Sequence, residues 1–189
     1  MITLSEILTS LYGAWRLLLR DPRGFEWLDD SIEGYWKSFF CAVVVLPGYG
    51  LWFIFTVYDV NFDAGLFRIL LVEGIGYIIG WVAWPLVMAS VAPAIKRDHN
   101  YIRYIVAYNW SAGISIGIYL IVLVLRLPGI VPDGIMAFFS FIALVVILSY
   151  HWYILRSGLE VSPAAAAGLV AGDFVLGQII SSFSRGMLH

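Results

Sequence analysis

Five long apolar segments dominate this sequence, and they restrict the folds open to the chain more than any other feature. They cover approximately residues 38–58, 66–91, 101–125, 134–154 and 163–183. A helix needs about 20 mainly apolar residues to cross the hydrocarbon core of a bilayer, and each segment meets that length. The sequence therefore predicts an all-α polytopic membrane protein: a five-helix transmembrane domain in residues 37–189, preceded by an amphipathic N-terminal helical segment in residues 1–36.

The composition favours the same fold class and excludes others. Hydrophobic residues make up 61% of the chain and charged residues 13%, whereas soluble domains carry about 25% charged residues. A soluble domain of 189 residues could not bury so much apolar surface. A net charge of −2 gives no basic face for a phosphate backbone, which argues against a nucleic-acid partner. The single cysteine, Cys41, excludes an internal disulfide and a multi-cysteine metal site.

The segment 1–36 is too polar to span a membrane and is predicted to lie on its surface. Thr3-Leu4-Ser5-Glu6 fits a capping box that starts a helix, and Asp21-Pro22 is expected to end it. Its apolar positions recur with helical spacing: Leu4, Leu8, Leu11, Trp15, Leu18 and Leu19. A second run is predicted to place Phe25, Leu28, Ile32, Tyr35 and Trp36 on one face. Such helices suit the membrane surface; a lid packed on the bundle or on a partner protein is an equal alternative.

Lysine and arginine in the loops predict the orientation. Eight fall on the side of the N-terminus: Arg16, Arg20, Arg23, Lys37, Lys96, Arg97, Arg103 and Arg156. Three fall on the other side: Arg68, Arg126 and Arg185. Because positive charge stays in the cytoplasm, we expect a cytoplasmic N-terminus and a C-terminus on the opposite side.

Three polar residues, Asp173, Glu73 and Asn109, fall inside the predicted spans. Asp173 follows Ser162 by eleven positions, about 16 Å along a helix and near the middle of a core about 30 Å thick. An ionised aspartate there costs about 2.5–3.5 kcal/mol. The sequence offers no basic partner at this depth. Because their helices run in opposite directions, the carboxyl groups of Asp173 and Glu73 can meet if those helices touch.

Each of these polar residues has glycines at four-residue spacing beside it, which lets helices approach closely in lipid. We therefore expect their side chains to point into the bundle. Two interpretations stay open: hydrogen-bonded glue between helices, worth about 0.6–2 kcal/mol per contact, or groups that carry protons or bind a cation.

No arrangement of residues indicates catalysis or a metal centre. His99, His151 and His189 lack metal-ligand spacing, and we expect them at the membrane interface or in solvent. The chain has no P-loop, HExxH or GxSxG motif. We therefore predict no enzymatic activity, no cofactor and no metal site. In the basic loop 92–104, Lys96, Arg97 and Arg103 set the topology, and they are also candidates for binding lipid headgroups.

Three stretches resemble the Yip1-domain family of membrane proteins. They are "YIRYIVAYNWSAGI" (101–114), "LSYHWYILRSGLEVSPAAAAGLV" (148–170) and "LLLRDPRGFEWL" (17–28), the last similar to the amphipathic lead-in of bacterial members. The resemblance implies a five-pass α-helical protein without known catalysis, in the bacterial cytoplasmic (inner) membrane. Eukaryotic relatives bind small GTPases, but this chain lacks the long cytoplasmic extension of those relatives.

Taken together, these features predict a non-enzymatic integral membrane protein. We expect it to act as a scaffold, accessory subunit or membrane-organising factor through membrane lipids and a protein partner or homo-oligomer. The alternative is a small channel or proton-coupled transporter that uses Asp173 and Glu73.

Overall fold

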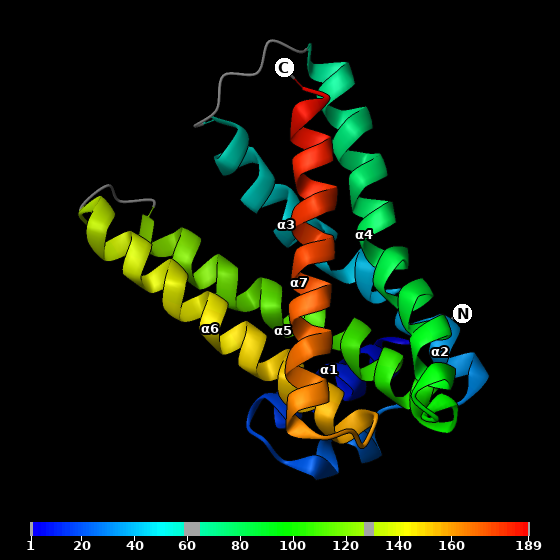
Figure 1. The fold of residues 1–189 in the computed structure, drawn as a ribbon. Helices are drawn as coiled ribbons and strands as arrows, with labels where there is room; N and C mark the ends of the chain where they lie inside the picture. Colours follow the sequence, from blue (N-terminus) through cyan, green and yellow to red (C-terminus); the bar gives the residue numbers. More distant parts are fainter. Residues whose placement is uncertain (1, 59–64, 127–130, 189) are drawn as a thin grey trace.

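The computed structural model describes residues 2–58, 65–126 and 131–188, so the terminal His189 lies outside the described residues. The described chain is built from helices joined by short connections (Figure 1). In chain order the elements are α1 (Leu4–Leu18), the 3-10 helix η1 (Pro22–Trp27), α2 (Ile32–Ser38), α3 (Cys41–Tyr58), α4 (Leu66–Ala94), the 3-10 helix η2 (Asp98–Asn100), α5 (Tyr101–Arg126), α6 (Asp133–Gly158) and α7 (Pro163–Gly186).

Five helical stretches in the described chain are long and apolar enough to cross a membrane. They are Ile32–Phe55, Leu66–Ala94, Asp98–Arg126, Asp133–Gly158 and Pro163–Gly186. The predicted all-α polytopic fold is therefore confirmed. The first stretch begins earlier than the sequence indicated, because Ser31 caps α2 and α2 leads directly toward α3. The expected division between residues 36 and 37 thus falls inside a helix.

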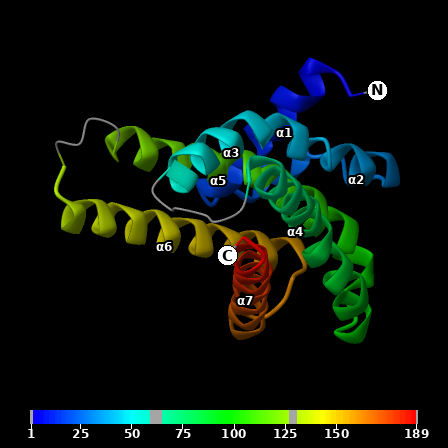
Figure 2. The ribbon, with the colours of Figure 1, turned by 90° about the horizontal axis from the view of Figure 1, so that it is seen from above.

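Helix α5 is the central element of the bundle. It contacts α1, α2, α3, α4 and α6, and its buried residues cluster in its first half. We call the end of the bundle that carries residues 2–38, 92–104 and 151–165 the basal end, and the opposite end the distal end. From the basal end, the α5–α6 pair leans away from α4 and α7 (Figures 1 and 2). The α5–α6 pair and the α4–α7 pair therefore separate toward the distal end, where α4 and α7 themselves lie close together (Figure 1).

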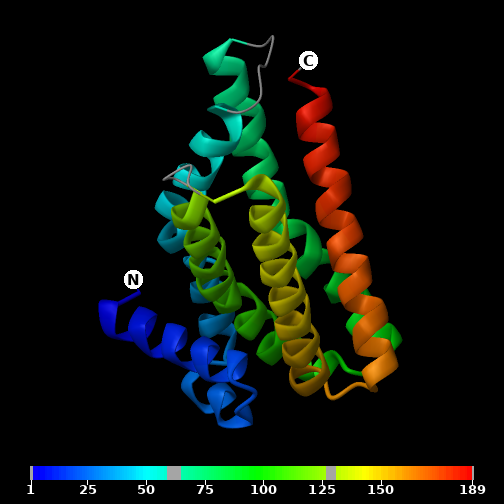
Figure 3. The ribbon, with the colours of Figure 1, turned by 90° about the vertical axis from the view of Figure 1, so that its left-hand side faces the viewer.

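Helix α1 lies across the basal end, steeply inclined to the long helices (Figure 3). The predicted capping box is present, with Thr3 and Glu6 bonded to each other's backbone N–H. Ala14 and Leu17 are fully buried, and the Tyr150 hydroxyl of α6 donates a 2.6 Å hydrogen bond to the Ala14 carbonyl. The N-terminal segment is therefore packed on the bundle, as the lid alternative proposed.

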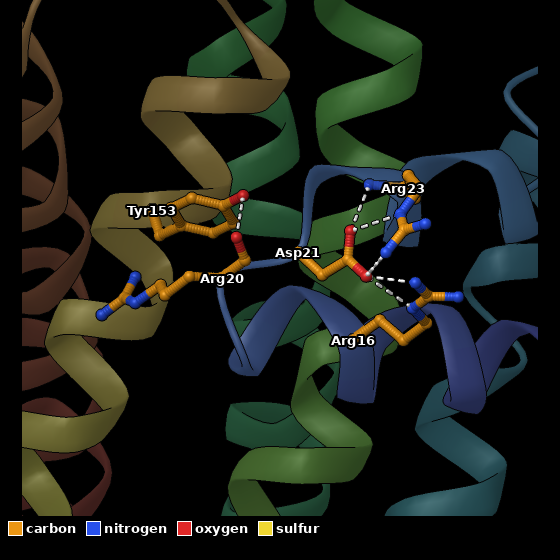
Figure 4. A network of polar contacts seen from close by, with 5 residues as sticks. All are labelled: Arg16, Arg20, Asp21, Arg23 and Tyr153. Atoms are coloured by element: carbon orange, nitrogen blue, oxygen red, sulfur yellow. Dashed lines mark hydrogen bonds and ion pairs between the residues drawn. The ribbon is translucent and has the colours of Figure 1, made fainter.

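A network of charges and backbone contacts fixes the turn after α1 (Figure 4). The helix ends at Leu18, and Arg20 adopts a positive φ of 63°, so the chain turns before Asp21-Pro22 is reached. Asp21 accepts hydrogen bonds from Arg16 Nε at 2.9 Å and from the Arg23 backbone N–H at 3.0 Å. The Arg16 guanidinium, followed by that of Arg23, lowers the pKa of Asp21 to about 2. The Tyr153 hydroxyl donates to the Arg20 carbonyl at 2.9 Å, which ties this turn to α6.

The second amphipathic run does not form one helical face, so that prediction was wrong. The run is divided between η1 and α2, because the Asp29 side chain accepts from the Ser31 N–H and Ser31 then caps a new helix. As a result Phe25 is buried while Trp36 is 68% exposed.

Candidate functional site: a polar cluster between α5, α6 and α7

Asp173 projects from α7 toward α5. The helix starts as predicted, with Ser162 as its cap and Pro163 in its first turn. The Tyr108 hydroxyl of α5 donates a 3.0 Å hydrogen bond to Asp173 Oδ1, and 17% of the Asp173 side chain is exposed. The carboxyl group therefore points into the bundle and has a hydrogen-bond donor from a neighbouring helix.

His151 of α6 is the second partner of Asp173. Its Nδ1 lies 3.7 Å from Asp173 Oδ2, and its Nε2 lies 3.4 Å from the Ser111 hydroxyl of α5. The expectation that Asp173 has no basic partner was therefore wrong. Helix α6 continues to Gly158, so His151 lies about two turns inside it and not at its end.

We call Tyr108, Ser111, His151 and Asp173 the polar cluster. A fourth helix, α4, packs beside the polar cluster. Its Trp84 Nε1 donates a 2.7 Å hydrogen bond to the buried Tyr104 hydroxyl of α5. Gly172 lies beside the same indole ring, since a Cβ added there would be 3.8 Å from it. This turn of α7, which carries Asp173 next to Gly172, thus lies beside Trp84 of α4.

Glu73 forms a separate site. It accepts a 3.2 Å hydrogen bond from the Tyr49 hydroxyl of α3, and the Tyr49 ring stacks obliquely on Tyr77 with centroids 4.7 Å apart. The register of α4 and α7 explains why the two carboxyl groups do not meet. Trp84 contacts Gly172, and Trp84 lies eleven residues after Glu73, about 16 Å along α4. The possibility that both carboxyls share one site is therefore not realised.

Asn109 is fully buried between α5 and α2. Its Nδ2 donates a 2.8 Å hydrogen bond to Ser38 Oγ, and the Ser38 hydroxyl donates to the Tyr35 carbonyl at 2.7 Å. Its Oδ1 has no hydrogen-bond partner in the described residues. Asn109 thus connects the first span to the central helix and takes no part in the polar cluster.

The three basic residues of the loop 92–104 have different surroundings. Lys96 adopts a positive φ of 60° just after α4. Arg103 pairs with Glu160 at 3.6 Å, and its guanidinium carbon lies 4.4 Å from the centre of the Phe25 ring. Arg97 borders an open groove of about 470 Å³ whose other lining residues are Ile95, Val161, Ser162, Ala165, Gly168 and Leu169. Of the three, Arg97 is thus the one that lies beside an apolar groove.

Comparison with known proteins adds no family. No protein-family model, curated protein or solved structure matches this chain. In the part of the chain that the structure describes, no three histidine, cysteine or acidic side chains are placed to hold a metal ion. The class of the protein therefore follows from its fold alone: an all-α integral membrane protein whose described residues include five helical stretches able to span the bilayer.

Proposed function

We propose that this protein is a non-enzymatic membrane-organising or scaffold protein of the bacterial cytoplasmic membrane, with its N-terminus in the cytoplasm. It acts through lipids and through a protein partner or second copy as a scaffold or accessory subunit. The observation that carries this proposal is the outward face of α1, which is apolar although the helix lies at an end of the bundle.

Helix α1 has an apolar outer face in addition to a buried face that contains Ala14 and Leu17. Its exposed side chains are Leu4, Ser5, Leu8, Tyr12 and Trp15, so Ser5 is the single polar member in this fully described helix, and the apolar stripe continues to Leu19. Three polar residues of α1, Glu6, Thr9 and Ser10, lie beside this stripe and line a cavity of about 190 Å³ that Lys37 also lines. A helix with this arrangement is stable where its outer face contacts lipid.

The direction and composition of α1 support insertion at the membrane interface. The helix lies across the long helices (Figure 3), and its exposed stripe includes Tyr12 and Trp15, the residue types that favour the boundary between headgroups and acyl chains. An in-plane helix of this kind occupies area in one leaflet only. This asymmetry supports a role in organising the membrane.

The proposed orientation rests on the distribution of basic residues, and the proposed family on the number of helices. The excess of basic residues near the basal end favours a cytoplasmic basal end, and a five-helix bundle is compatible with the resemblance to Yip1-domain proteins.

Spin-label accessibility in lipid nanodiscs tests the proposal. We expect labels at Leu8→Cys and Leu19→Cys to be more accessible to oxygen than to a water-soluble nickel complex, because both positions face lipid. Thr9→Cys, one residue away on the inward face, is the matched control and should be shielded from both reagents. Labels at positions 8 and 19 that respond mainly to the nickel complex would place α1 in water and contradict the proposal.

The second candidate function is a small channel or proton-coupled transporter. The contact of Asp173 with His151 favours it, whereas neither of the two cavities described above is lined by Asp173. Proton flux into proteoliposomes that is present in the wild type and lost in Asp173→Asn would select this function over the scaffold.

A further inference from the structure

We propose that the open groove beside Arg97 binds an anionic phospholipid, with the lipid phosphate on the Arg97 guanidinium and an acyl chain along α7. The inference rests on the proposed function, because it needs the basal end to lie at a membrane surface. It adds to that function the chemical class of the lipid and the residues that bind it.

Two turns held by hydrogen bonds form the basal part of this groove. The connections from α4 to α5 and from α6 to α7 both lie at the basal end (Figure 3). After α4, Lys96 has a positive φ of 60°, and the Arg97 N–H donates to the Ala92 carbonyl at 2.8 Å. After α6, the Val161 N–H donates to the Arg156 carbonyl at 3.3 Å in the same way. Such bonds are typical of the Schellman motif that ends helices, so Arg97 and Val161 border the groove from fixed backbone positions.

Arg97 supplies a positive charge that no carboxylate neutralises. The residue is half-buried, and among the residues that the structure describes it takes part in no ion pair. Glu160, which directly precedes Val161, is already paired with Arg103 at 3.6 Å. The described lining of the groove includes no acidic side chain. Because a charge that is partly removed from water favours a counter-ion, the groove suits an anion and offers no partner to the ammonium group of a zwitterionic lipid.

The remainder of the groove suits a hydrocarbon chain. Ala165, Gly168 and Leu169 line it from α7, at the three- and four-residue spacing that places side chains on one helix face. Ile95 lines it from the end of α4. A Cβ added at Gly168 would meet nothing within 4 Å, so the space over this glycine is open.

The size and lining of the groove favour a lipid over a free anion. Its volume of about 470 Å³ lies within the range of small-molecule sites, about 300–1,000 Å³. A free phosphate would contact Arg97 and use none of the apolar lining. A phospholipid uses both parts, because its phosphate and its acyl chains belong to one molecule.

The depth of the groove matches the layers of a phospholipid. The Trp152 indole donates a 3.0 Å hydrogen bond to the Pro163 carbonyl, and tryptophan favours the boundary between headgroups and acyl chains. The start of α7 is therefore expected at that boundary. Leu169 follows Ser162 by seven residues, about 10 Å along the helix. The charge thus lies at the level of the headgroups, and the apolar lining extends into the layer of the acyl chains.

Photocrosslinking in lipid nanodiscs tests the site with phosphatidylglycerol as the probe. Full-length protein is placed in phosphatidylcholine nanodiscs that hold a small fraction of phosphatidylglycerol with a diazirine on one acyl chain. We expect labelling of residues 161–169 to exceed the labelling by diazirine-phosphatidylcholine at the same fraction. Arg97→Gln should reduce this excess about tenfold, because a hydrogen bond to a charged group is lost. Lys96→Gln is the matched control: it removes the neighbouring charge, which does not line the groove, and should reduce the excess less than about twofold.

A second variant tests the acyl-chain part of the site and leaves Arg97 in place. Gly168→Leu fills the open space in the groove and should also remove the excess of phosphatidylglycerol labelling. Gly177→Leu is its control, because a Cβ there also meets nothing within 4 Å but the residue lies outside the groove; its labelling should equal that of the wild type. Unchanged labelling in Gly168→Leu would show that no acyl chain lies in the groove and would overturn the proposal.

Two further outcomes would also contradict the lipid site. One is equal labelling of the wild type by the two lipids, and the other is an equal loss in Arg97→Gln and Lys96→Gln. Either result, obtained with spin labels at positions 8 and 19 that face lipid, would overturn the lipid site and leave the scaffold function standing. The two proposals can therefore fail separately.

Discussion

The basal end holds the large buried cluster of the bundle, whereas the buried cluster at the distal end of the described chain is small and consists of Ile69, Val72 and Leu188. The buried residues of α5 begin at Tyr104 and end at Ser115, and the remaining residues to Arg126 include none in this described helix. In α6, Ile154 and Leu155 near the basal end are buried, while Phe138 and Phe141 toward the distal end are 60% and 62% exposed. The difference lies in packing and not in composition, because the distal residues are equally apolar.

This difference shows that the helices are packed mainly against protein at the basal end and are exposed for contact with lipid at the distal end. Basal packing relies on side chains that fill the space between α1, α5 and α6, with hydrogen bonds such as Tyr150 to Ala14. Distal side chains are apolar around most of each helix, which is typical of helices surrounded by lipid. Lipid acyl chains therefore provide at the distal end the contacts that protein provides at the basal end.

Truncating one buried and one exposed isoleucine of α6 should give the largest contrast. Ile154 is fully buried and Ile142 is 41% exposed. We expect Ile154→Ala to reduce the free energy of unfolding in bicelles by about 2–5 kcal/mol, because it leaves a cavity. Ile142→Ala should cost less than about 1 kcal/mol, since acyl chains fill the space that it leaves. Equal losses at the two positions would break the comparison.

Adding a methyl group at Gly24, where η1 packs on α1, should have the next largest effect on stability. A Cβ at Gly24 would lie 2.7 Å from the Gly13 carbonyl oxygen and 2.7 Å from Leu17 Cγ, and neither the backbone nor the buried leucine can move freely. We expect Gly24→Ala to lower stability by about 1–3 kcal/mol. Gly168→Ala in α7, where a Cβ meets nothing within 4 Å, is the control and should not destabilise. A neutral Gly24→Ala would show that α1 and η1 are not closely packed.

The smallest expected effect is a pH response confined to the basal end. Lys37 and then the Thr3 backbone lower the pKa of Glu6 to about 2, and Arg16 lowers that of Asp21 to about 2. Because these values lie below those of free carboxyls, about 4, the stability that they contribute is complete above pH 4 and is lost as the pH falls through 2. Both pairs reach solvent, so the effect is small.

Hydrogen exchange of α1 amides, normalised to the intrinsic rate at each pH, measures this response. Protection of α1 should fall between pH 5 and pH 2, while residues 116–126 of α5 should be unchanged. Asp21→Asn should show reduced protection already at pH 5 and a smaller change on acidification. Protection that changes equally in both regions would point to general unfolding.

Hydropathy and capping chemistry were enough to predict much of the fold. The five spans depend on a property of each segment alone, and so do the starts of α1 at Thr3 and of α7 at Ser162. The division of residues 25–36 into η1 and α2 was not predicted. The apolar spacing indicated one continuous helix, but Ser31 caps a new helix there.

The candidate site was predictable only in part, because it depends on how helices align. Asp173, Glu73 and Asn109 stand out by polarity, but the α4–α7 register, which places Trp84 beside Gly172 and separates Asp173 from Glu73, depends on tertiary packing. His151 was missed because the sequence placed the helix end at residue 154. The missed signal was an ionisable residue still followed by apolar Trp152–Leu155, which makes it a candidate for function within a span.

The attachment of α1 to α6 has a consequence for synthesis of the chain. Tyr150 and the Ala14 carbonyl that it binds are 136 residues apart. At a translation rate of 5–20 residues per second, α1 leaves the ribosome roughly 7–27 s before its partner exists. During that interval α1 has no contact with α6, and its apolar stripe can bind the membrane surface instead. Helix α1 is thus made well before the contact that fixes it to α6 can form.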